Sequence, residues 1–470
     1  MKKLSLLVLL AATMPFSGCK KNQVPNQAAA PSGPTSGRPD ELLSFTSSAT
    51  DPDGDGVAIR FDWGDGDTSD WSAVVAGGTA VTDSHSWSAA SIYSVRAQAK
   101  DAGDVLSAWS DGHQLSVALS WTRTFGGTNM DDGRSVQQTS DGGYIITGFT
   151  WSFGAGLDDV YLIKTNASGD TLWIRTYGGT DIDEGYSVQQ TSDGGYIIAG
   201  TTASFGAGGT DIYLIRTSAS GDTLWTRTYG EPEPANEYCY SVRQTGDGGF
   251  IVAGLASGGT CLIKTDASGN TLWTRTCGLR ASSVQQTTDG GYVIAGVGNS
   301  SVCLVKTGAS GDELWTRYYG YGSGESVQQT TDGGYIIVGS GGHVAEGNSD
   351  VYLVRTDANG DTIWTKTYGG TGGDAGNSVQ QTSDGGYIIA GCTTSFGAGL
   401  EDVYLIKTNP QGDTLWARTY GGQHADQGFS VQQTTDGGYI VAGLTLSYGA
   451  GYVDVWLIKT DADGNVGTGN

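Results

Sequence analysis

The sequence predicts an all-β protein in which a small β-sandwich precedes a seven-bladed β-propeller of four-stranded blades. The first observation is composition: 77 of the 470 residues are Gly, and they separate short apolar stretches of the kind that form strands. The second is the phrase D-G-G-[YF], which begins at Asp141, Asp193, Asp247, Asp289, Asp332, Asp384 and Asp436. The third is a recurring Trp, at Trp121, Trp173, Trp225, Trp273, Trp315, Trp364 and Trp416. A β-type repeat of roughly 50 residues is typical of propeller blades.

Residues 1–19 have the form of an export signal. Lys2 and Lys3 precede an apolar run at residues 4–12, and the small residues Ser17 and Gly18 stand before Cys19. A basic start, a short apolar run and small residues at the end are typical of a secretory signal. The apolar run is too short to span a bilayer.

The end of this segment, Phe16-Ser17-Gly18-Cys19, resembles the lipobox of bacterial lipoproteins, although Phe16 stands where Leu is usual. The resemblance implies cleavage before Cys19 and lipid attachment to that residue; ordinary secretion is the alternative. Residues 20–38 are rich in Pro, Ser, Ala and Gln, which predicts a flexible tether. We therefore expect an exported protein that a lipid anchor holds at the cell envelope or cell surface.

Residues 39–118 show short alternating stretches between turn clusters, which favours a β-sandwich. The turn Phe61-Asp62-Trp63-Gly64-Asp65-Gly66 resembles the W-D-F-G-D-G-like turn of PKD and related immunoglobulin-like modules of surface proteins. The resemblance covers about 80 residues and implies a spacer or an adhesion unit.

An Asp-rich segment in this region allows two interpretations. Asp51, Asp53 and Asp55 match D-x-D-x-D-G, and Asp62 falls at the twelfth position of the same count. Oxygen ligands at alternate positions suit Ca²⁺, but the flanking sequence is β-prone rather than helical. The alternatives are a Ca²⁺ site at these four carboxylates and an Asp/Gly-rich hairpin turn.

Each repeat divides into four predicted strands, at residues 187–191, 196–200, 211–217 and 223–229 in one example. The repeats resemble the glycine-rich propeller repeats of microbial cell-surface proteins. A weaker resemblance to quinoprotein propellers implies that the segment around Gly221 packs against a Trp between blades, with no cofactor carried over.

The phase of the repeat predicts a closed ring. The propeller region, residues 119–470, begins with a lone fourth-type strand at residues 119–124. It ends after a third-type strand at residues 454–460. The first strand can therefore complete the last blade.

Two sets of polar residues recur in the repeats. Lys or Arg occurs in each third strand, at Lys164, Arg216, Lys264, Lys306, Arg355, Lys407 and Lys459, and in each fourth strand, as at Arg123 and Arg175. We interpret them as cations on outer strands that discourage edge-to-edge aggregation. Paired residues such as Gln137 and Gln138 lie in the innermost strand and are predicted to line a polar central channel.

One face of the ring is predicted to carry the ligand site. It collects the loops that contain Asp131, Asp132, Phe153, Asp183, Glu184, Phe205, Asp374, Phe396, Asp426 and Tyr448. These residues come from blades 1, 2, 6 and 7, which become neighbours when the ring closes. Aromatic rings beside carboxylates suit sugars, cations or Ca²⁺-bridged partners. The alternative is that the Phe rings pack into their own loops and the acids only solvate the surface.

Charge and motif content narrow the function. There are 25 Lys and Arg against 49 Asp and Glu, a net charge of −24, which disfavours nucleic acid as a partner. The four His residues occupy no repeated setting, and no hydrolase or zinc motif is present.

We therefore expect a non-catalytic binding, adhesion or scaffold protein for a carbohydrate or a surface protein. The alternatives are a polysaccharide hydrolase or lyase that uses acids on the loop face, and a structural surface-layer component. Five Cys follow Cys19, at Cys239, Cys261, Cys277, Cys303 and Cys392, and their pairing is left open.

Overall fold

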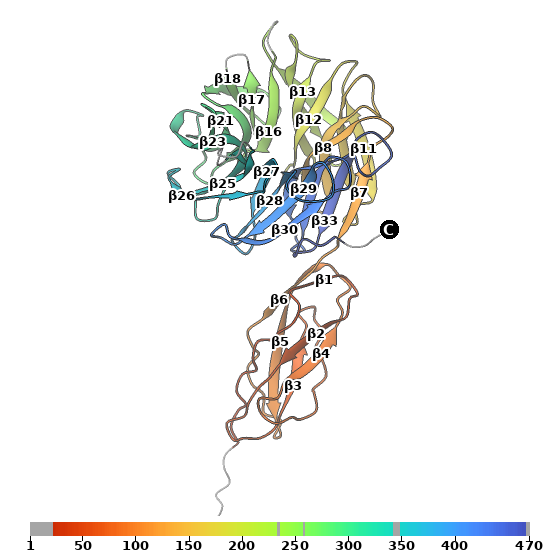
Figure 1. The fold of residues 1–470 in the computed structure, drawn as a ribbon, viewed down its shortest axis with the longest axis vertical. Helices are drawn as coiled ribbons and strands as arrows, with labels where there is room; N and C mark the ends of the chain where they lie inside the picture. The colour runs from red at the N-terminus through yellow and green to blue at the C-terminus, as the bar shows by residue number, and fades with distance from the viewer. Residues whose placement is uncertain (1–21, 233–235, 257–258, 342–347, 467–470) are drawn as a thin grey trace, which may run out of the picture. The chain divides into compact units, whose positions relative to one another are not determined.

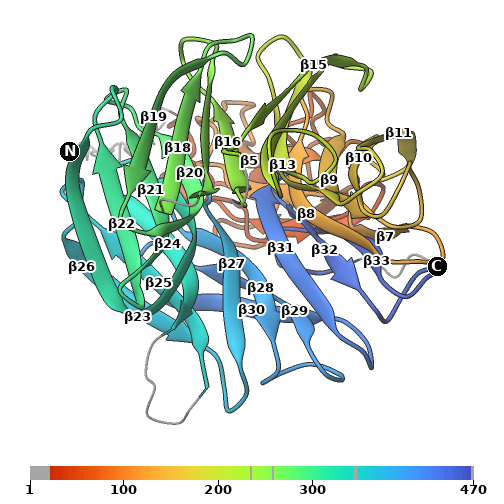
Figure 2. The ribbon, with the colours of Figure 1, turned by 90° about the horizontal axis from the view of Figure 1, so that it is seen from above.

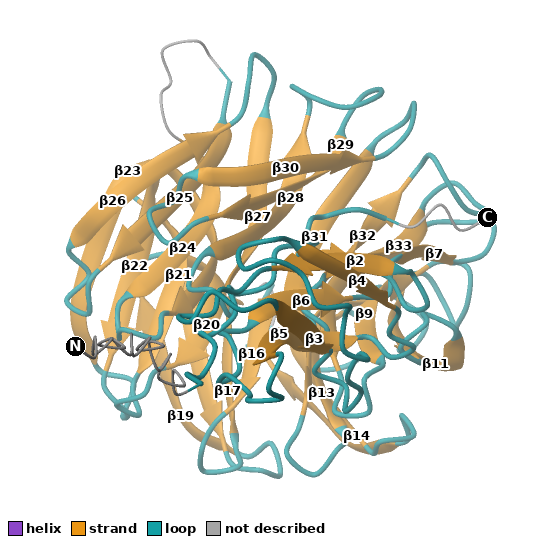
Figure 3. Cartoon of the chain, turned by 90° about the horizontal axis from the view of Figure 1, so that it is seen from below, coloured by secondary structure: helices purple, strands orange, loops and turns teal. Residues whose placement is uncertain are grey.

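The structure is a computed structural model, and it describes residues 22–232, 236–256, 259–341 and 348–466. The predicted lipidation site, Cys19, lies outside these residues. Every regular element of the described chain is a β-strand (Figure 3). No helix in the described chain is long and apolar enough to cross a membrane.

The chain divides into two compact units (Figure 1). The first comprises the described residues up to 115, except for residues 36–39 and 88–92, which group with the second. The N-terminal strands are β1 (Ser36–Gly37), β2 (Leu43–Ser47), β3 (Val57–Asp62), β4 (Val81–His85), β5 (Ser91–Asp101) and β6 (His113–Val117).

These strands form two small sheets, one in the order β1-β6-β5-β3 and the other pairing β2 with β4. Aromatic rings fill the space inside the unit, because Phe45, Trp63 and Trp87 are all buried. The ring centroids of Trp63 and Trp87 lie 6.0 Å apart, nearly perpendicular, an arrangement that aromatic pairs prefer.

The second unit repeats one antiparallel sheet, whose strands run in chain order from the innermost to the outermost. Its first sheet contains β8 (Asp131–Gln138), β9 (Tyr144–Thr150), β10 (Asp159–Thr165) and β11 (Thr171–Tyr177). The second contains β12 (Asp183–Gln190), β13 (Tyr196–Thr202), β14 (Asp211–Thr217) and β15 (Thr223–Tyr229). The third contains β16 (Tyr238–Gln244), β17 (Phe250–Ala256), β18 (Gly259–Thr265) and β19 (Thr271–Cys277). The next two repeats share the long strand β23 and form one seven-stranded sheet of β20 (Arg280–Gln286), β21 (Tyr292–Gly298), β22 (Ser301–Thr307), β23 (Glu313–Gln329), β24 (Tyr335–Gly341), β25 (Asp350–Thr356) and β26 (Thr362–Tyr368).

The last two sheets contain β27 (Asp374–Gln381), β28 (Tyr387–Thr393), β29 (Asp402–Thr408) and β30 (Thr414–Tyr420), and then β31 (Asp426–Gln433), β32 (Tyr439–Thr445), β33 (Asp454–Thr460) and β7 (Trp121–Phe125). Strand β7 pairs antiparallel with β33, so that Arg123 lies opposite Leu457. The first strand of this unit therefore completes its last sheet. The sheets lie around a common centre (Figure 2), an arrangement consistent with a β-propeller.

Hydrogen bonds join each innermost strand to the next one around the centre. A backbone N–H of a Val in one sheet donates to a Ser hydroxyl in the preceding sheet, at 3.1 to 3.4 Å. The seven donor and acceptor pairs are Val188 and Ser135, Val242 and Ser187, Val284 and Ser241, Val327 and Ser283, Val379 and Ser326, Val431 and Ser378, and Val136 and Ser430. The last pair links the seventh innermost strand to the first.

Each Trp of an outer strand packs under a turn of the following sheet. A Cβ atom added to Gly221 would lie 2.9 Å from the Trp173 ring, so this turn requires Gly. The hydroxyl of Tyr177 also donates to the Gly221 carbonyl at 2.6 Å. The predicted packing of Trp against the S-G-D turns is confirmed.

The third-strand cations are not the outward-facing charges that the sequence predicted. All seven are buried, and each pairs with the Asp of the D-G-G turn of its own sheet, as Lys164 does with Asp141 at 2.9 Å. The interpretation as anti-aggregation charges was wrong for them, because the third strand lies inside the sheet. The fourth-strand Arg175 is partly exposed and lies 3.8 Å from Asp222 in the next sheet.

Candidate functional site

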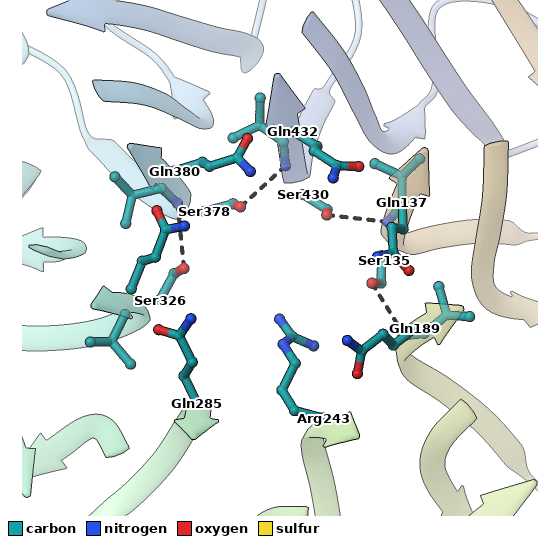
Figure 4. A pocket seen from close by; sticks show the side chains of 16 residues that line it. Ser135, Gln137, Gln189, Arg243, Gln285, Ser326, Ser378, Gln380, Ser430 and Gln432 are labelled. Atoms are coloured by element: carbon teal, nitrogen blue, oxygen red, sulfur yellow. Dashed lines mark hydrogen bonds between the residues drawn. The ribbon is translucent and has the colours of Figure 1, made fainter. Parts of the chain in front are cut away.

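A polar channel runs through the centre of the second unit (Figure 4). Its volume is about 220 Å³, and every innermost strand contributes to its lining. The first Gln of each predicted pair lines it, at Gln137, Gln189, Gln285, Gln328, Gln380 and Gln432, with Arg243 at the corresponding position of β16. The prediction of an amide-lined channel is confirmed for these residues.

The second Gln of each pair binds the neighbouring sheet instead. The Oε1 atom of Gln190 accepts a hydrogen bond from the backbone N–H of Ser140 at 2.9 Å, and its Nε2 donates to the Gly194 carbonyl. This Gln therefore holds two adjacent sheets together.

A second and larger cavity, of about 480 Å³, is lined mostly by residues that precede the channel residues in the innermost strands, together with Val297 of β21. These strands begin after the loops and run toward the D-G-G turns, so this cavity lies at the loop end of the channel. We call it the mouth cavity.

One residue in each innermost strand is directed into the mouth cavity by a β-bulge. In β12 the pairing with β13 shifts between Gly185 and Ser187, which leaves Tyr186 outside the ladder. The same shift occurs in all seven innermost strands, and the bulged residues are Arg134, Tyr186, Tyr240, Ser282, Glu325, Asn377 and Phe429. All seven line the mouth cavity. Bulges commonly redirect a side chain beside a functional site.

The residue type at the bulge position varies among the seven repeats, whereas the two positions that follow it do not vary. The residues that follow it are Ser and Val in all seven repeats, whereas the bulge position holds a cation, an anion, aromatic rings, an amide and a hydroxyl. Uniform positions maintain the scaffold. A position that varies in chemistry and converges on one cavity is suited to an asymmetric ligand.

Several contacts fix the mouth side chains. The Arg134 guanidinium lies 4.3 Å from the centroid of the Phe429 ring, and its Nη2 donates to Asp132 at 2.6 Å. Tyr186 and Tyr240 make an edge-to-face contact with centroids 5.6 Å apart. The Tyr186 hydroxyl also donates to Glu184 at 2.6 Å. These contacts arrange the side chains before any ligand arrives.

Two buried carboxyl groups, Asp132 and Asp158, have raised pKa values. Burial raises the pKa of Asp132 to about 6, although the charge of Arg134 opposes the shift. Burial, together with the charges of Glu184, Asp159 and Asp132, raises the pKa of Asp158 to about 7. The Oδ1 atoms of Asp132 and Asp158 accept no hydrogen bond from any residue that the structure describes. Both groups therefore change charge close to neutral pH.

Four of the predicted ligand acids are buried under their loops rather than gathered on an exposed face. Asp131, Asp183, Asp374 and Asp426 lie in this position. Asp183 accepts hydrogen bonds from the Gly179 N–H at 2.8 Å and from the Ser204 hydroxyl at 2.6 Å. Such a carboxylate shapes the loop above it, and it contacts solvent little. Asp132 and Glu184 border the mouth cavity through Arg134 and Tyr186.

The four predicted loop aromatics are half exposed, as expected for a contact surface. Each also packs on an aromatic residue of its own third strand. The pairs are Phe153 and Tyr161, Phe205 and Tyr213, Phe396 and Tyr404, and Tyr448 and Trp456, with centroids 5.2 to 6.0 Å apart. One ring face is therefore occupied by the protein itself.

The structure does not bring the four predicted Ca²⁺ ligands together. Asp62 pairs with Arg96 at 2.5 Å, and Asp53 accepts hydrogen bonds from Gln23. Asp51 accepts the N–H of Asp53, as in a simple turn, and Asp55 is exposed. Among the described residues, the carboxylate and imidazole atoms that do cluster within 4.8 Å belong to Asp65, Asp67 and His85.

Three of the cysteines are free thiols. Cys277, Cys303 and Cys392 are all buried and unbridged, and Cys239 is buried. Burial raises the pKa of the Cys277 thiol to about 11, so it stays protonated and unreactive.

Sequence reasoning missed the mouth cavity. The signal was present as the x of G-x-S-V-Q-Q, the position whose side chain differs most among the seven repeats, but strict strand alternation does not show that a bulge turns this residue toward the centre.

Comparisons with known proteins give partial likenesses. No protein-family model matches the chain, and no curated protein sequence matches it. A PKD domain of an M14-like peptidase from Thermoplasmatales archaeon SCGC AB-540-F20 is similar over 21% of this chain and 98% of its own, at 35% identity and a TM-score of 0.20. A protein of unknown function from Bacteroides caccae is similar over 57% of this chain and 92% of its own, at 15% identity and a TM-score of 0.39.

A third similar structure is Drosophila Plexin A in complex with Semaphorin 1b. It covers 72% of this chain and 88% of its own, at 6% identity and a TM-score of 0.38. The solved structures similar to this chain thus include a PKD domain and larger β-rich folds.

Proposed function

We propose that the chain is an exported, lipid-anchored binding protein that holds a carbohydrate in the mouth cavity of a closed seven-bladed β-propeller. Residues 1–19 are its signal and Cys19 its lipidation site. Residues 20–38 lead from that site into the first unit, where Asn22 and Gln23 donate to Asp101 and Asp53. Residues 39–118 are a PKD-like spacer, and residues 119–470 are the propeller. The pairing of β7 with β33 and the seven Val–Ser hydrogen bonds support the closed ring.

The observation that carries the binding role is the bulge position. Seven equivalent residues on a uniform scaffold converge on one cavity, and their side chains differ. Tyr186, Tyr240 and Phe429 offer ring faces on which a sugar can stack, and Arg134, Glu325 and Asn377 offer planar polar groups for hydroxyls. Apolar walls with a few fixed polar groups are typical of small-molecule sites.

The test is a glycan-array screen of the full chain, followed by calorimetric titration of each glycan that binds. Replacing Tyr240 and Phe429 together with Ala should weaken binding at least about tenfold, because two stacking surfaces are lost. The matched variant replaces the loop aromatics Phe153, Phe205, Phe396 and Tyr448 with Ser. Binding that is lost in the loop variant but kept in the mouth variant would move the site to the loops. Absence of any glycan ligand would overturn the carbohydrate proposal and favour a protein partner.

A hydrolase or lyase is the second candidate, and the raised pKa of Asp132 favours it. A carboxylic acid that keeps its proton near neutral pH can act as a general acid, and Glu325 in the cavity could supply the second carboxylate. A product assay on the same glycans tests it. Cleavage that disappears in both Asp132→Asn and Glu325→Gln would replace the binding role with catalysis.

A further inference from the structure

The lining of the central channel presents hydrogen-bond donors almost exclusively. Six Gln side chains line it, and the Oε1 atom of each accepts a backbone N–H from the next innermost strand, at 2.5 to 2.7 Å. The acceptors are Gln137, Gln189, Gln285, Gln328, Gln380 and Gln432. A backbone N–H can only donate, so the amide orientation is fixed and each Nε2 group faces the channel.

The Ser hydroxyls of the channel follow the same rule. Each accepts a Val N–H from the next strand, as Ser135 does from Val188 at 3.3 Å. A hydroxyl that has accepted one such bond keeps its own hydrogen to donate. The channel therefore combines amide and hydroxyl donors, and its described lining contains no Asp or Glu.

Arg243 places one positive charge among these donors. Figure 4 shows its guanidinium directed into the channel between Gln189 and Gln285. Its Nη1 donates to the Val242 carbonyl at 2.8 Å and to the Ser187 hydroxyl at 3.3 Å, both uncharged partners. No described carboxylate lies within 4.0 Å of it. A cation enclosed without a counterion is unfavourable unless an anion accompanies it.

The presence of Arg at this position also removes a scaffold contact. In the other six repeats the channel Gln accepts the N–H of the second Gln in the next strand. Arg has no acceptor, and the N–H of Gln286 consequently makes no such bond to Arg243. Arg in place of Gln therefore removes one hydrogen bond between neighbouring innermost strands and adds one positive charge.

We propose that the channel binds a small oxyanion, such as sulfate, phosphate or a carboxylate, between the Arg243 guanidinium and the surrounding Gln amides. The planar guanidinium donates in parallel to two oxygens of such a group, and the amides and hydroxyls supply the remaining donors. The channel volume of about 220 Å³ exceeds the roughly 15 Å³ that one water needs, so an ion can enter with part of its hydration. This site is separate from the mouth cavity and does not depend on its ligand.

Calorimetric titration of the full chain with sodium sulfate, sodium phosphate and sodium acetate, in a buffer of low ionic strength, tests the site. We expect saturable binding of at least one of these anions in the millimolar range or tighter, and the three arms separate tetrahedral anions from a carboxylate. Arg243→Gln restores the residue found in the other repeats, so it should fold and melt at or above the wild-type temperature without added anion.

Arg243→Gln should weaken binding of that anion by roughly tenfold or more, and Arg243→Lys, which keeps the charge but loses the fork, by less. Arg227→Gln removes a partly exposed cation of an outer strand and should leave binding unchanged. Binding that persists in Arg243→Gln, or no saturable binding of any of the three anions by the wild type, would overturn the proposal.

Discussion

The Nζ atom of Lys459 lies 3.0 Å from Oδ2 of Asp436, and the Lys459 side chain is completely shielded from solvent. The ammonium also donates to the Thr460 carbonyl at 3.0 Å. An equivalent pair, with Arg in place of Lys at Arg216 and Arg355, occurs in all seven sheets, where it ties the third strand to the D-G-G turn between the first two strands.

Lys459→Met should destabilise the protein by about 3 kcal/mol, because Asp436 is left nearly buried without its cation. Urea denaturation followed by tryptophan fluorescence measures the loss. The matched variant is Lys366→Met, which removes a cation from the partly exposed pair with Asp413, and its effect should be small. Equal effects of the two variants would show that burial does not govern these pairs.

Gly221→Ala should be more destabilising than Gly194→Ala. Both residues have positive φ, at 82° and 86°, so both substitutions carry the same backbone strain. Only the Cβ at position 221 would press on Trp173, because nothing lies within 4 Å of the one at position 194. We expect an additional loss of about 1–3 kcal/mol from overpacking, measured as the difference between the two unfolding free energies.

Asp426→Ala should destabilise the protein by about 1–3 kcal/mol, since the N–H of Gly422 and the hydroxyl of Ser447 lose their buried acceptor. Tyr448→Ser, at the exposed tip of the same loop, should change stability much less. Thermal melting of the two variants compares them. If Asp426→Ala were neutral for stability, the carboxylate would be available for a ligand, as the sequence predicted.

The titration of Asp158 should lower the free energy of unfolding as the pH rises from about 4 to 7. The pKa of Asp158 is raised from 3.8 to about 7, so the folded chain holds more protons than the unfolded chain in this window. Proton excess in the folded state makes the unfolding free energy decrease with pH. Asp158→Asn removes the titrating group and should give a flatter profile between pH 4 and 7. Parallel profiles for the two proteins would place the pKa near its ordinary value.

The repeat alone predicted most of the four-stranded units, because the D-G-G turns and the period-two stretches mark strand ends directly. The phase of the first and last strands also predicted that β7 pairs with β33. The burial of Lys164 was not predicted. A single charged residue in an apolar strand is expected to be exposed, and the sequence does not show that Asp141 lies beside it as an ion-pair partner.

The candidate site was harder to predict, for two physical reasons. A β-bulge such as the one at Tyr186 breaks the alternation from which side-chain direction is inferred. Acids such as Asp183 looked like surface charges, since the hydroxyl and N–H groups that surround them come from loops whose folding the sequence does not reveal.

The pairing of β7 with β33 also imposes an order of events on the folding chain. Arg123 emerges early in synthesis, whereas its partner Leu457 emerges near the end. Until then the edge of the last sheet has no partner, and exposed edges invite aggregation and proteolysis. Contacts between residues so distant in sequence also form slowly. A nascent molecule is therefore most vulnerable just before its final strand arrives, and the speed at which β33 becomes available is the expected determinant of its yield.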